Sequence, residues 1–173
     1  MTESATMNKA AIPRRSVWEN RWSEPTVEQL LEGLKEHHRK PIEWLLEQIP
    51  TLDGIDQRLQ WYGKAWKWTL ELTFRDAEGN DLGVLAYVVP RPEEPVVSIP
   101  LRAEVYDQLP MRRLNKYIRD GVRSAKCAVE LYWAGWTPTS KSDAEHLFDL
   151  IKRKHRMCRG ETSQQQQQQT KKA

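Results

Sequence analysis

Large apolar and polar side chains alternate from residue 66 to residue 75, and this two-residue period constrains the fold more than any other feature of the chain. The apolar positions are Trp66, Trp68, Leu70, Leu72 and Phe74. Successive side chains of a strand point to opposite faces of a sheet, so the pattern predicts a strand with these apolar side chains on one face. Their burial would contribute on the order of 10 kcal/mol before chain entropy is subtracted, so folding requires neither a metal nor a disulfide.

Further strands are expected on the C-terminal side of this one. Turn-forming residues over 76–81 and a β-branched stretch over 82–89 predict the returning strand of a hairpin. Residues 96–101 predict a third strand, shorter and at an edge of the sheet, because the prolines between residues 90 and 95 interrupt pairing just before it. Alternation over 127–133 predicts a fourth strand.

Two short helices are predicted before the first strand. Thr26 and Gln29 form a capping box for a helix over 27–38, and Pro41 suits the first turn of a second helix that ends at Pro50. The apolar positions of both segments recur at three and four residues, which is the spacing of one helix face.

Helical spacing returns after the third predicted strand. It predicts helices over 103–109 and 110–122, and a last helix whose capping box is Ser142 with Glu145 and whose end lies near Cys158. The order of elements indicates an α+β fold, with a small, mostly antiparallel sheet of about four to five strands and helices packed on one face.

The chain of 173 residues fits one domain. We expect an ordered domain over 23–159 between a mobile N-terminal segment, 1–22, and a disordered, Gln-rich basic tail, 160–173. The longest apolar run, 84–89, is far shorter than the roughly 20 residues that cross a bilayer, and no export signal opens the chain. These features predict a cytoplasmic protein that has no contact with a membrane.

Basic residues concentrate near the C-terminal end. Residues 152–173 carry seven basic side chains and one acidic one, a balance of 7 − 1 = +6, which leaves 3 − 6 = −3 for residues 1–151. A near-neutral body argues against a surface devoted to nucleic acid, because counterion release needs a continuous basic face. Anion or weak nucleic-acid binding through the last helix stays open, although the helix dipole also gives cations there a structural role. The candidate residues are Lys152, Arg153, Arg156 and Arg159.

Aromatic and basic residues interleave from residue 61 to residue 68, as they do where flat ligands stack on a protein. Trp66 and Trp68 share the apolar face of the predicted strand, so we expect them in the core. Trp61 has the opposite parity, and Gly63 can bend the chain beside it. The candidate ligand-binding residues are Trp61, Tyr62, Lys64 and Lys67.

The sequence contains no P-loop, G-x-S-x-G, G-x-G-x-x-G, H-E-x-x-H or C-x-x-C motif. We therefore expect a protein that is not an enzyme and holds no cofactor or metal. Glu28, Glu32 and Glu36 would share a helix face and could hold iron loosely, but the basic residues among them favour a solvated surface. Cys127 and Cys158 are expected to be buried thiols in a reducing compartment.

Several short motifs occur in the order found in uncharacterised bacterial domains. They are Leu59-Gln60-Trp61-Tyr62-Gly63-Lys64, Trp66-Lys67-Trp68, Leu85-Ala86-Tyr87-Val88-Val89-Pro90 and, in the last helix, Ile151-Lys152-Arg153-Lys154. By these motifs the chain resembles the YdhG-like superfamily from about Pro25 to Met157. The resemblance implies a helical hairpin, a small antiparallel sheet and a closing helix. Because some members are described as frataxin-like iron chaperones, it also implies a role in iron handling. The Pro-rich loop and the glutamine tail depart from the family pattern.

The leading functional hypothesis is a non-catalytic binding or adaptor domain, which holds a small ligand or a protein partner against the sheet or its aromatic rim. Weak nucleic-acid binding through the basic last helix and tail is the first alternative. Iron handling by family analogy is the second.

Overall fold

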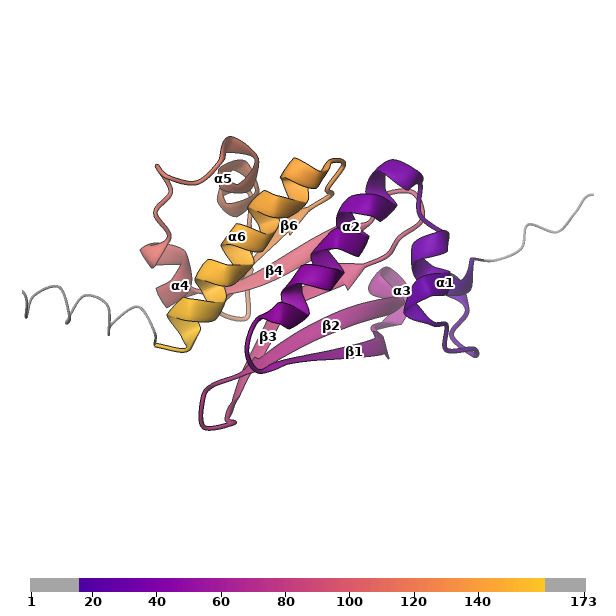
Figure 1. The fold of residues 1–173 in the computed structure, drawn as a ribbon, viewed down its shortest axis with the longest axis horizontal. Helices are drawn as coiled ribbons and strands as arrows, with labels where there is room; N and C mark the ends of the chain where they lie inside the picture. The colour runs from indigo at the N-terminus through magenta and orange to yellow at the C-terminus, as the bar shows by residue number, and fades with distance from the viewer. Residues whose placement is uncertain (1–15, 161–173) are drawn as a thin grey trace, which may run out of the picture.

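A six-stranded antiparallel sheet forms the centre of the molecule, with the strand order β1-β2-β3-β4-β6-β5 (Figure 1). This computed structural model describes residues 16–160, so most of the expected N-terminal segment and nearly all of the expected tail lie outside it. The strands are β1 (Ile55–Trp61), β2 (Trp68–Arg75), β3 (Asp81–Val89), β4 (Val96–Arg102), β5 (Lys126–Ala128) and β6 (Leu131–Trp136). The helices are α1 (Val27–Glu32), α2 (Glu36–Gln48), α3 (Gly63–Trp66), α4 (Ala103–Gln108), α5 (Lys116–Arg123) and α6 (Lys141–Cys158), with the 3-10 turns η1 (Val17–Glu19) and η2 (Ile49–Thr51).

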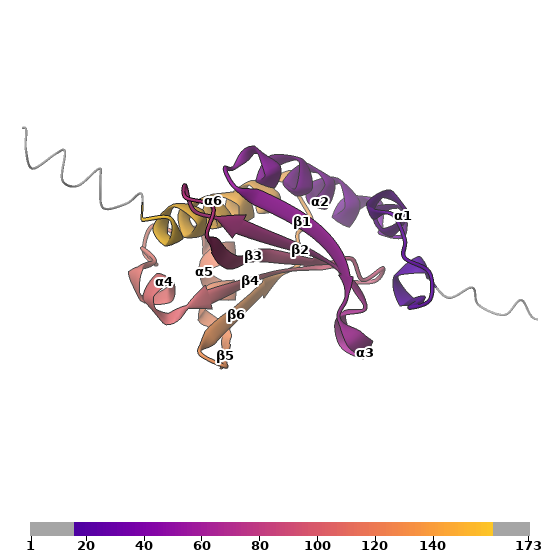
Figure 2. The same ribbon diagram turned by 90° about the horizontal axis from the view of Figure 1, so that it is seen from below.

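Helices α2 and α6 lie side by side across one face of the sheet (Figures 1 and 2). The alternating apolar side chains of β2 point into this layer, where Leu70, Leu72 and Phe74 are almost completely buried. The expected α+β fold with helices on one face of an antiparallel sheet is confirmed, with six strands in place of four to five. In the described part of the chain, no helix has the length and apolar character needed to cross a lipid bilayer.

Three strand predictions differ from the structure. β4 lies inside the sheet, where it pairs with β3 on one side and β6 on the other, so the prediction of an edge strand is wrong. The alternation over 127–133 is a hairpin rather than one strand, because Val129 and Glu130 take positive φ between β5 and β6. The alternation of β2 begins at Trp68, whereas Trp66 ends the short helix α3.

The predicted helices have different ends in the structure. Pro41 lies inside α2 rather than in its first turn, and the segment over 27–38 is divided between α1 and α2. The helix expected over 110–122 is α5, which begins only after the capping side chain of Asn115. The cap of α6 is Ser140 with Asp143, because Ser140 accepts the N–H of Asp143 and the Asp143 carboxylate accepts the N–H of Ser140.

The ordered domain begins before residue 23. Trp18 in η1 is only 6% exposed, and its indole N–H donates a hydrogen bond to the carbonyl oxygen of Trp66 at 3.2 Å. Glu19 forms an ion pair with Lys67 at 2.5 Å. Residues 16–20 therefore pack beside α3, and the domain boundary predicted from the sequence is too late.

Strands β3 and β4 pair over only part of their length: residues 87–89 of β3 pair with residues 96–98 of β4. The backbone N–H and C=O of a strand residue point to the same neighbouring strand, and the carbonyl of Pro100 faces β3. Pro100 has no N–H to donate in that direction, so the ladder between β3 and β4 does not continue past its last pair, Tyr87 with Ser98. Register shifts between β2 and β3 also begin at Leu72 and Thr73. The result is a gap between two central strands.

Candidate ligand-binding site

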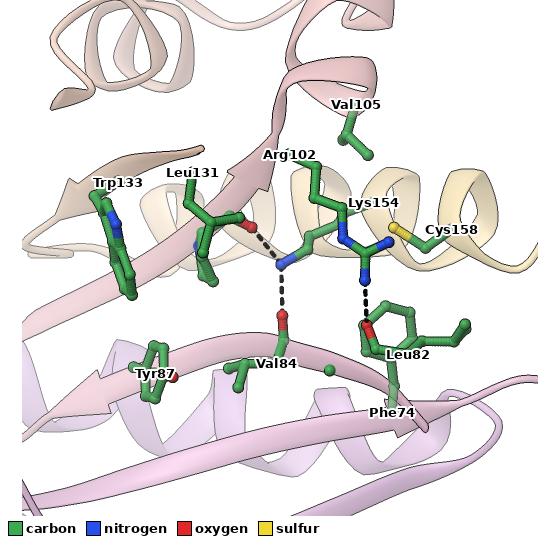
Figure 3. Close-up of a pocket in the computed structure, with 12 residues that line it drawn as sticks. Phe74, Leu82, Val84, Tyr87, Arg102, Val105, Leu131, Trp133, Lys154 and Cys158 are labelled. Carbon is green, nitrogen blue, oxygen red and sulfur yellow. Dashed lines mark hydrogen bonds between the residues drawn. The ribbon is translucent and has the colours of Figure 1, made fainter. Parts of the chain in front are cut away.

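The gap between β3 and β4 contains a cavity of about 180 Å³ (Figure 3). Lys154 from α6 and Arg102 from the end of β4 contribute its charged groups. Its walls include the apolar or aromatic side chains of Phe74, Leu82, Tyr87, Val105, Leu131 and Trp133. Among the described residues that line the cavity, none carries a carboxylate side chain, so the two basic side chains give the lining a net positive charge.

Lys154 reaches from α6 into the gap and is 4% exposed. Its Nζ donates hydrogen bonds to the carbonyl oxygens of Val84 at 2.7 Å, Leu85 at 3.0 Å and Pro100 at 2.5 Å. Two of these acceptors belong to β3 and one to β4, so a single ammonium group joins the strands where their ladder ends. An ammonium group has three N–H donors, and all three are used here. Lys154 thus supplies the donors that buried carbonyl groups require where no backbone N–H is present.

Arg102 makes a second bridge across the gap. Its Nη2 donates to the carbonyl oxygen of Leu82 at 3.1 Å, again from β4 to β3 (Figure 3). Arg102 is exposed, and a guanidinium group has five N–H donors, so donors remain for a ligand. An anion that enters the cavity would meet Arg102 directly and would also be attracted by the charge on Lys154.

The pKa of Lys154 is lowered to about 7, mainly by burial; Cys158 acts against this shift and the charge of Arg102 adds to it. Burial also raises the pKa of the Cys158 thiol, one turn further along α6. The charge of Lys154 therefore changes in the neutral pH range, while Cys158 stays protonated there. The cavity is thus more positive below pH 7 than above it.

Tyr87 and Trp133 form the aromatic side of the cavity, with stacked rings whose centroids are 6.0 Å apart. Trp66 contacts both rings, with centroid distances of 5.1 Å to Tyr87 and 5.9 Å to Trp133, and Tyr62 packs on Tyr87 at 5.6 Å. Val88, next to Tyr87 in β3, points into the core. Since neighbouring strand residues point to opposite faces, this aromatic cluster lies on the sheet face away from α2 and α6.

The structure separates the four residues predicted to bind a ligand. Tyr62 joins the aromatic cluster, whereas Trp61 packs against the core around Trp68 on the face covered by helices. Lys67 is held by its ion pair with the N-terminal segment, and Lys64 is exposed on α3. None of the four is among the described residues that line the cavity.

The four cations predicted to contact an anion also have different surroundings. Lys152 pairs with Asp149 at 2.7 Å, and Arg159 donates to two backbone carbonyl oxygens at 2.8 Å and 3.1 Å. Arg156 is exposed, and Arg153 lines a separate groove beside α5. The last helix therefore does not present these residues as one surface.

Lys154 and Arg102 are absent from the predicted site residues. Lys154 continues the apolar spacing of α6, since it lies three residues after Ile151 and four before Cys158. This spacing is the sequence signal that predicts the burial of Lys154. No sequence signal brings Arg102 close to Lys154, because their proximity depends on the point where two strands separate.

The described residues contain no group of three or more His, Cys, Asp or Glu side chains that could hold a metal ion. Glu36, one of the acidic residues considered for iron, pairs with Lys40 at 2.6 Å. Cys158 is partly buried, but Cys127 is exposed because it lies on β5 at the edge of the sheet, so the prediction that it is buried is wrong.

Comparisons of the chain with protein-family models, with curated proteins and with solved structures find no match. The resemblance to the YdhG-like superfamily therefore stays a prediction. The fold and the cavity define an α+β domain whose antiparallel sheet is split at its centre, with a positively charged cavity in the split.

Proposed function

We propose that this domain is a non-catalytic binding module for a small molecule with an apolar body and one anionic group, and that the cavity between β3 and β4 is its site. The supporting observation is that two cationic side chains, and no carboxylate of the described residues, line a mostly apolar cavity. A carboxylate or similar anion would pair with Arg102, and the rings of Tyr87 and Trp133 would contact the apolar body.

The size of the cavity restricts the ligand. An apolar cavity of about 150 Å³ holds one benzene molecule, and the cavity here has about 180 Å³. One ring with a short acidic substituent fits this volume, and benzoate is the simplest such probe. Benzamide has nearly the same shape without the charge and serves as the matched neutral probe.

Calorimetric titration of the full chain with benzoate and with benzamide tests this proposal. We expect saturable benzoate binding that is about tenfold tighter than benzamide binding. The substitution Arg102→Gln should weaken benzoate binding by about tenfold or more, because a hydrogen bond to a charged group contributes about 1.5–3 kcal/mol. The control Arg75→Gln removes an exposed arginine outside the cavity and should leave the affinity unchanged. Equal affinities for the two probes, or an unchanged affinity in Arg102→Gln, would contradict the proposal.

Benzoate affinity should also depend on pH, because Lys154 loses its proton near pH 7. Above this pH the cavity carries less positive charge, so benzoate binding should weaken as the pH rises, and binding near pH 7 should take up protons. Calorimetry at pH 7 in two buffers with different ionisation enthalpies measures this uptake. Binding without proton uptake would show that Lys154 does not contribute to anion recognition.

A further inference from the structure

A dense group of basic residues lies between α4 and the end of β5. Its members are Arg112, Arg113, Lys116, Arg119, Arg123 and Lys126, with Asp120 as the one acidic residue in this stretch of sequence. The balance over 112–126 is 6 − 1 = +5, on a chain whose net charge is +3. This charge excess lies outside the basic C-terminal segment, residues 152–173.

These cationic side chains have no partners within residues 16–160. Neither an ion pair nor a hydrogen bond joins any of them to another described side chain or backbone group, and the same is true of Arg153 and Arg156 in α6. On α2, by contrast, Arg39 pairs with Glu43 at 3.5 Å, as Lys40 does with Glu36. A cationic surface without internal partners attracts an external anion.

Three of the cations form a stripe along α5. Lys116, Arg119 and Arg123 are three and four residues apart; Lys116 and Arg123 are exposed, and Arg119 is half-buried beside the face that carries the buried Ile118 and Val122. At about 1.5 Å per residue, this helix is about 12 Å long. One strand of a nucleic-acid duplex presents about three phosphates over that length, at about 3.4 Å each.

A groove of about 360 Å³ between α5 and α6 extends this surface. Arg113 lies on its α5 side and Arg153 on its α6 side; Figure 1 shows the two helices as neighbours. Asp149, the acidic residue among those that line the groove, is already paired with Lys152. The groove lining therefore contains two guanidinium groups and one carboxylate, which is already paired with Lys152.

We propose that the α5 stripe and the adjoining groove bind the phosphodiester backbone of a nucleic acid. Most of the unpaired cations are arginines, whose planar guanidinium groups present paired N–H donors that match two phosphate oxygens. Contacts to phosphate carry no sequence information, so binding should be independent of base sequence. This surface shares no residue with the cavity between β3 and β4 and does not depend on the function proposed for it.

Fluorescence anisotropy with the full chain and a labelled RNA of about 20 nucleotides and mixed sequence tests the proposal between about 50 and 200 mM salt. We expect binding at the lower salt concentration and a slope of log K against log salt of about −3, as for about four neutralised phosphates on a single strand. The triple variant Lys116→Gln/Arg123→Gln/Arg153→Gln should lose about tenfold or more in affinity and about two units of slope.

The matched control is Lys35→Gln/Lys40→Gln/Lys141→Gln, which removes the same net charge from exposed lysines that are paired with glutamates. Its RNA affinity should stay within about threefold of the unmodified protein, because these charges are already neutralised. Both variants retain the C-terminal tail, so the comparison isolates the surface of α5 and α6.

The same sequence as single-stranded DNA separates the two sources of phosphodiester. Equal affinity for RNA and DNA supports contacts to phosphate alone, and tighter RNA binding supports the same site with added contacts to the 2′-hydroxyl group. Three results would overturn the proposal: no binding at about 50 mM salt, equal losses in the variant and its control, or competition by polyglutamate as effective as that by unlabelled RNA. Benzoate binding in the cavity is measured separately, so either proposal can fail alone.

Discussion

Basic residues have opposite surroundings in two regions of this domain. Between β3 and β4, Lys154 is buried and gives its N–H donors to backbone carbonyl groups of both strands. Around α5, arginine and lysine side chains have no partner among the described residues. The partners of a cation, rather than its charge, therefore decide whether the fold depends on it. Substitutions in the gap should therefore change stability, and substitutions on α5 should change binding.

The largest effect is expected from Lys154→Met, which keeps the length and apolar character of the side chain but removes its donors. Two buried carbonyl groups and one partly buried one would lose their partner, and each loss costs about 1–3 kcal/mol, partly offset because a charge is no longer buried. We expect the free energy of unfolding to fall by about 2–4 kcal/mol in urea denaturation.

Lys152→Met is the matched control, since Lys152 lies on the same helix and forms only a surface ion pair. Its effect should stay below about 1 kcal/mol. If the two variants are equally stable, Lys154 does not hold the strands together and the contrast with α5 disappears.

Gly121→Ala tests how closely α5 packs against β6, which is the contact that holds the helix on the domain. A Cβ atom at this position would lie 2.0 Å from Nε1 of Trp136, whose indole N–H donates to the carbonyl oxygen of Tyr117 at 3.1 Å. Either the ring or the helix must move, so we expect a loss of about 1–3 kcal/mol in thermal or urea unfolding. RNA affinity should fall as well, because the phosphate-binding stripe moves with the helix.

Gly135→Ala provides the comparison for that variant. The Cβ atom there would lie 3.3 Å from a methyl group of Val96, which can shift slightly. A small change in stability is expected at Gly135. If both variants lose the same stability, the close contact of the new Cβ atom with Trp136 does not explain the effect of Gly121→Ala.

The stability of the domain should rise with pH just above neutrality because of Lys154. Burial lowers its folded-state pKa from 10.5 to about 7, so between these values the unfolded chain binds more protons than the folded one. Stability then increases with pH in this window, and is lost again as the pH falls toward 7. For one such group the gain between pH 7 and pH 8 is about 1 kcal/mol.

Urea unfolding at the two pH values measures this gain, and subtraction of the same difference in Lys154→Met removes the contribution of the other titrating groups. If that variant does not fold, the Cε chemical shift of Lys154 in the unmodified protein reports its titration directly. A midpoint near 10.5 would show that the three carbonyl acceptors outweigh the effect of burial on the pKa.

Local patterns predicted much of the fold. The alternation of β2 from Trp68 onward and the apolar stripe of α6 each depend on neighbouring residues, and both are confirmed. β1 was not predicted because most of its own residues are polar, such as Gln57 and Arg58, which are exposed at the edge of the sheet. The central position of β4 could not be predicted from the prolines before it, since its second partner is β6, about 30 residues further along.

The site was harder to predict for the same reason. Lys154 belongs to a run of basic residues that reads as a solvated helix face, and its burial depends on the gap that Pro100 creates in a distant strand. The basic residues around α5 were visible in the sequence, but their significance depends on the absence of partners within the described chain. Both properties follow from contacts between segments, which a local pattern does not contain.

The smallest effect on stability is expected from the double variant Lys116→Gln/Arg123→Gln on α5. Like charges three and four residues apart on a helix destabilise it by about 0.2–0.5 kcal/mol per pair, and both substituted residues are such neighbours of Arg119, but they are also three and four residues from Asp120, whose attraction offsets this repulsion. Urea unfolding at about 50 mM salt should therefore show stability unchanged within about 0.5 kcal/mol, and any difference should vanish in about 1 M salt because the charges are screened. A loss of more than about 1 kcal/mol would mean that these side chains help to hold α5 in place. A weaker RNA affinity in the triple variant would then report a displaced helix rather than lost contacts to phosphate.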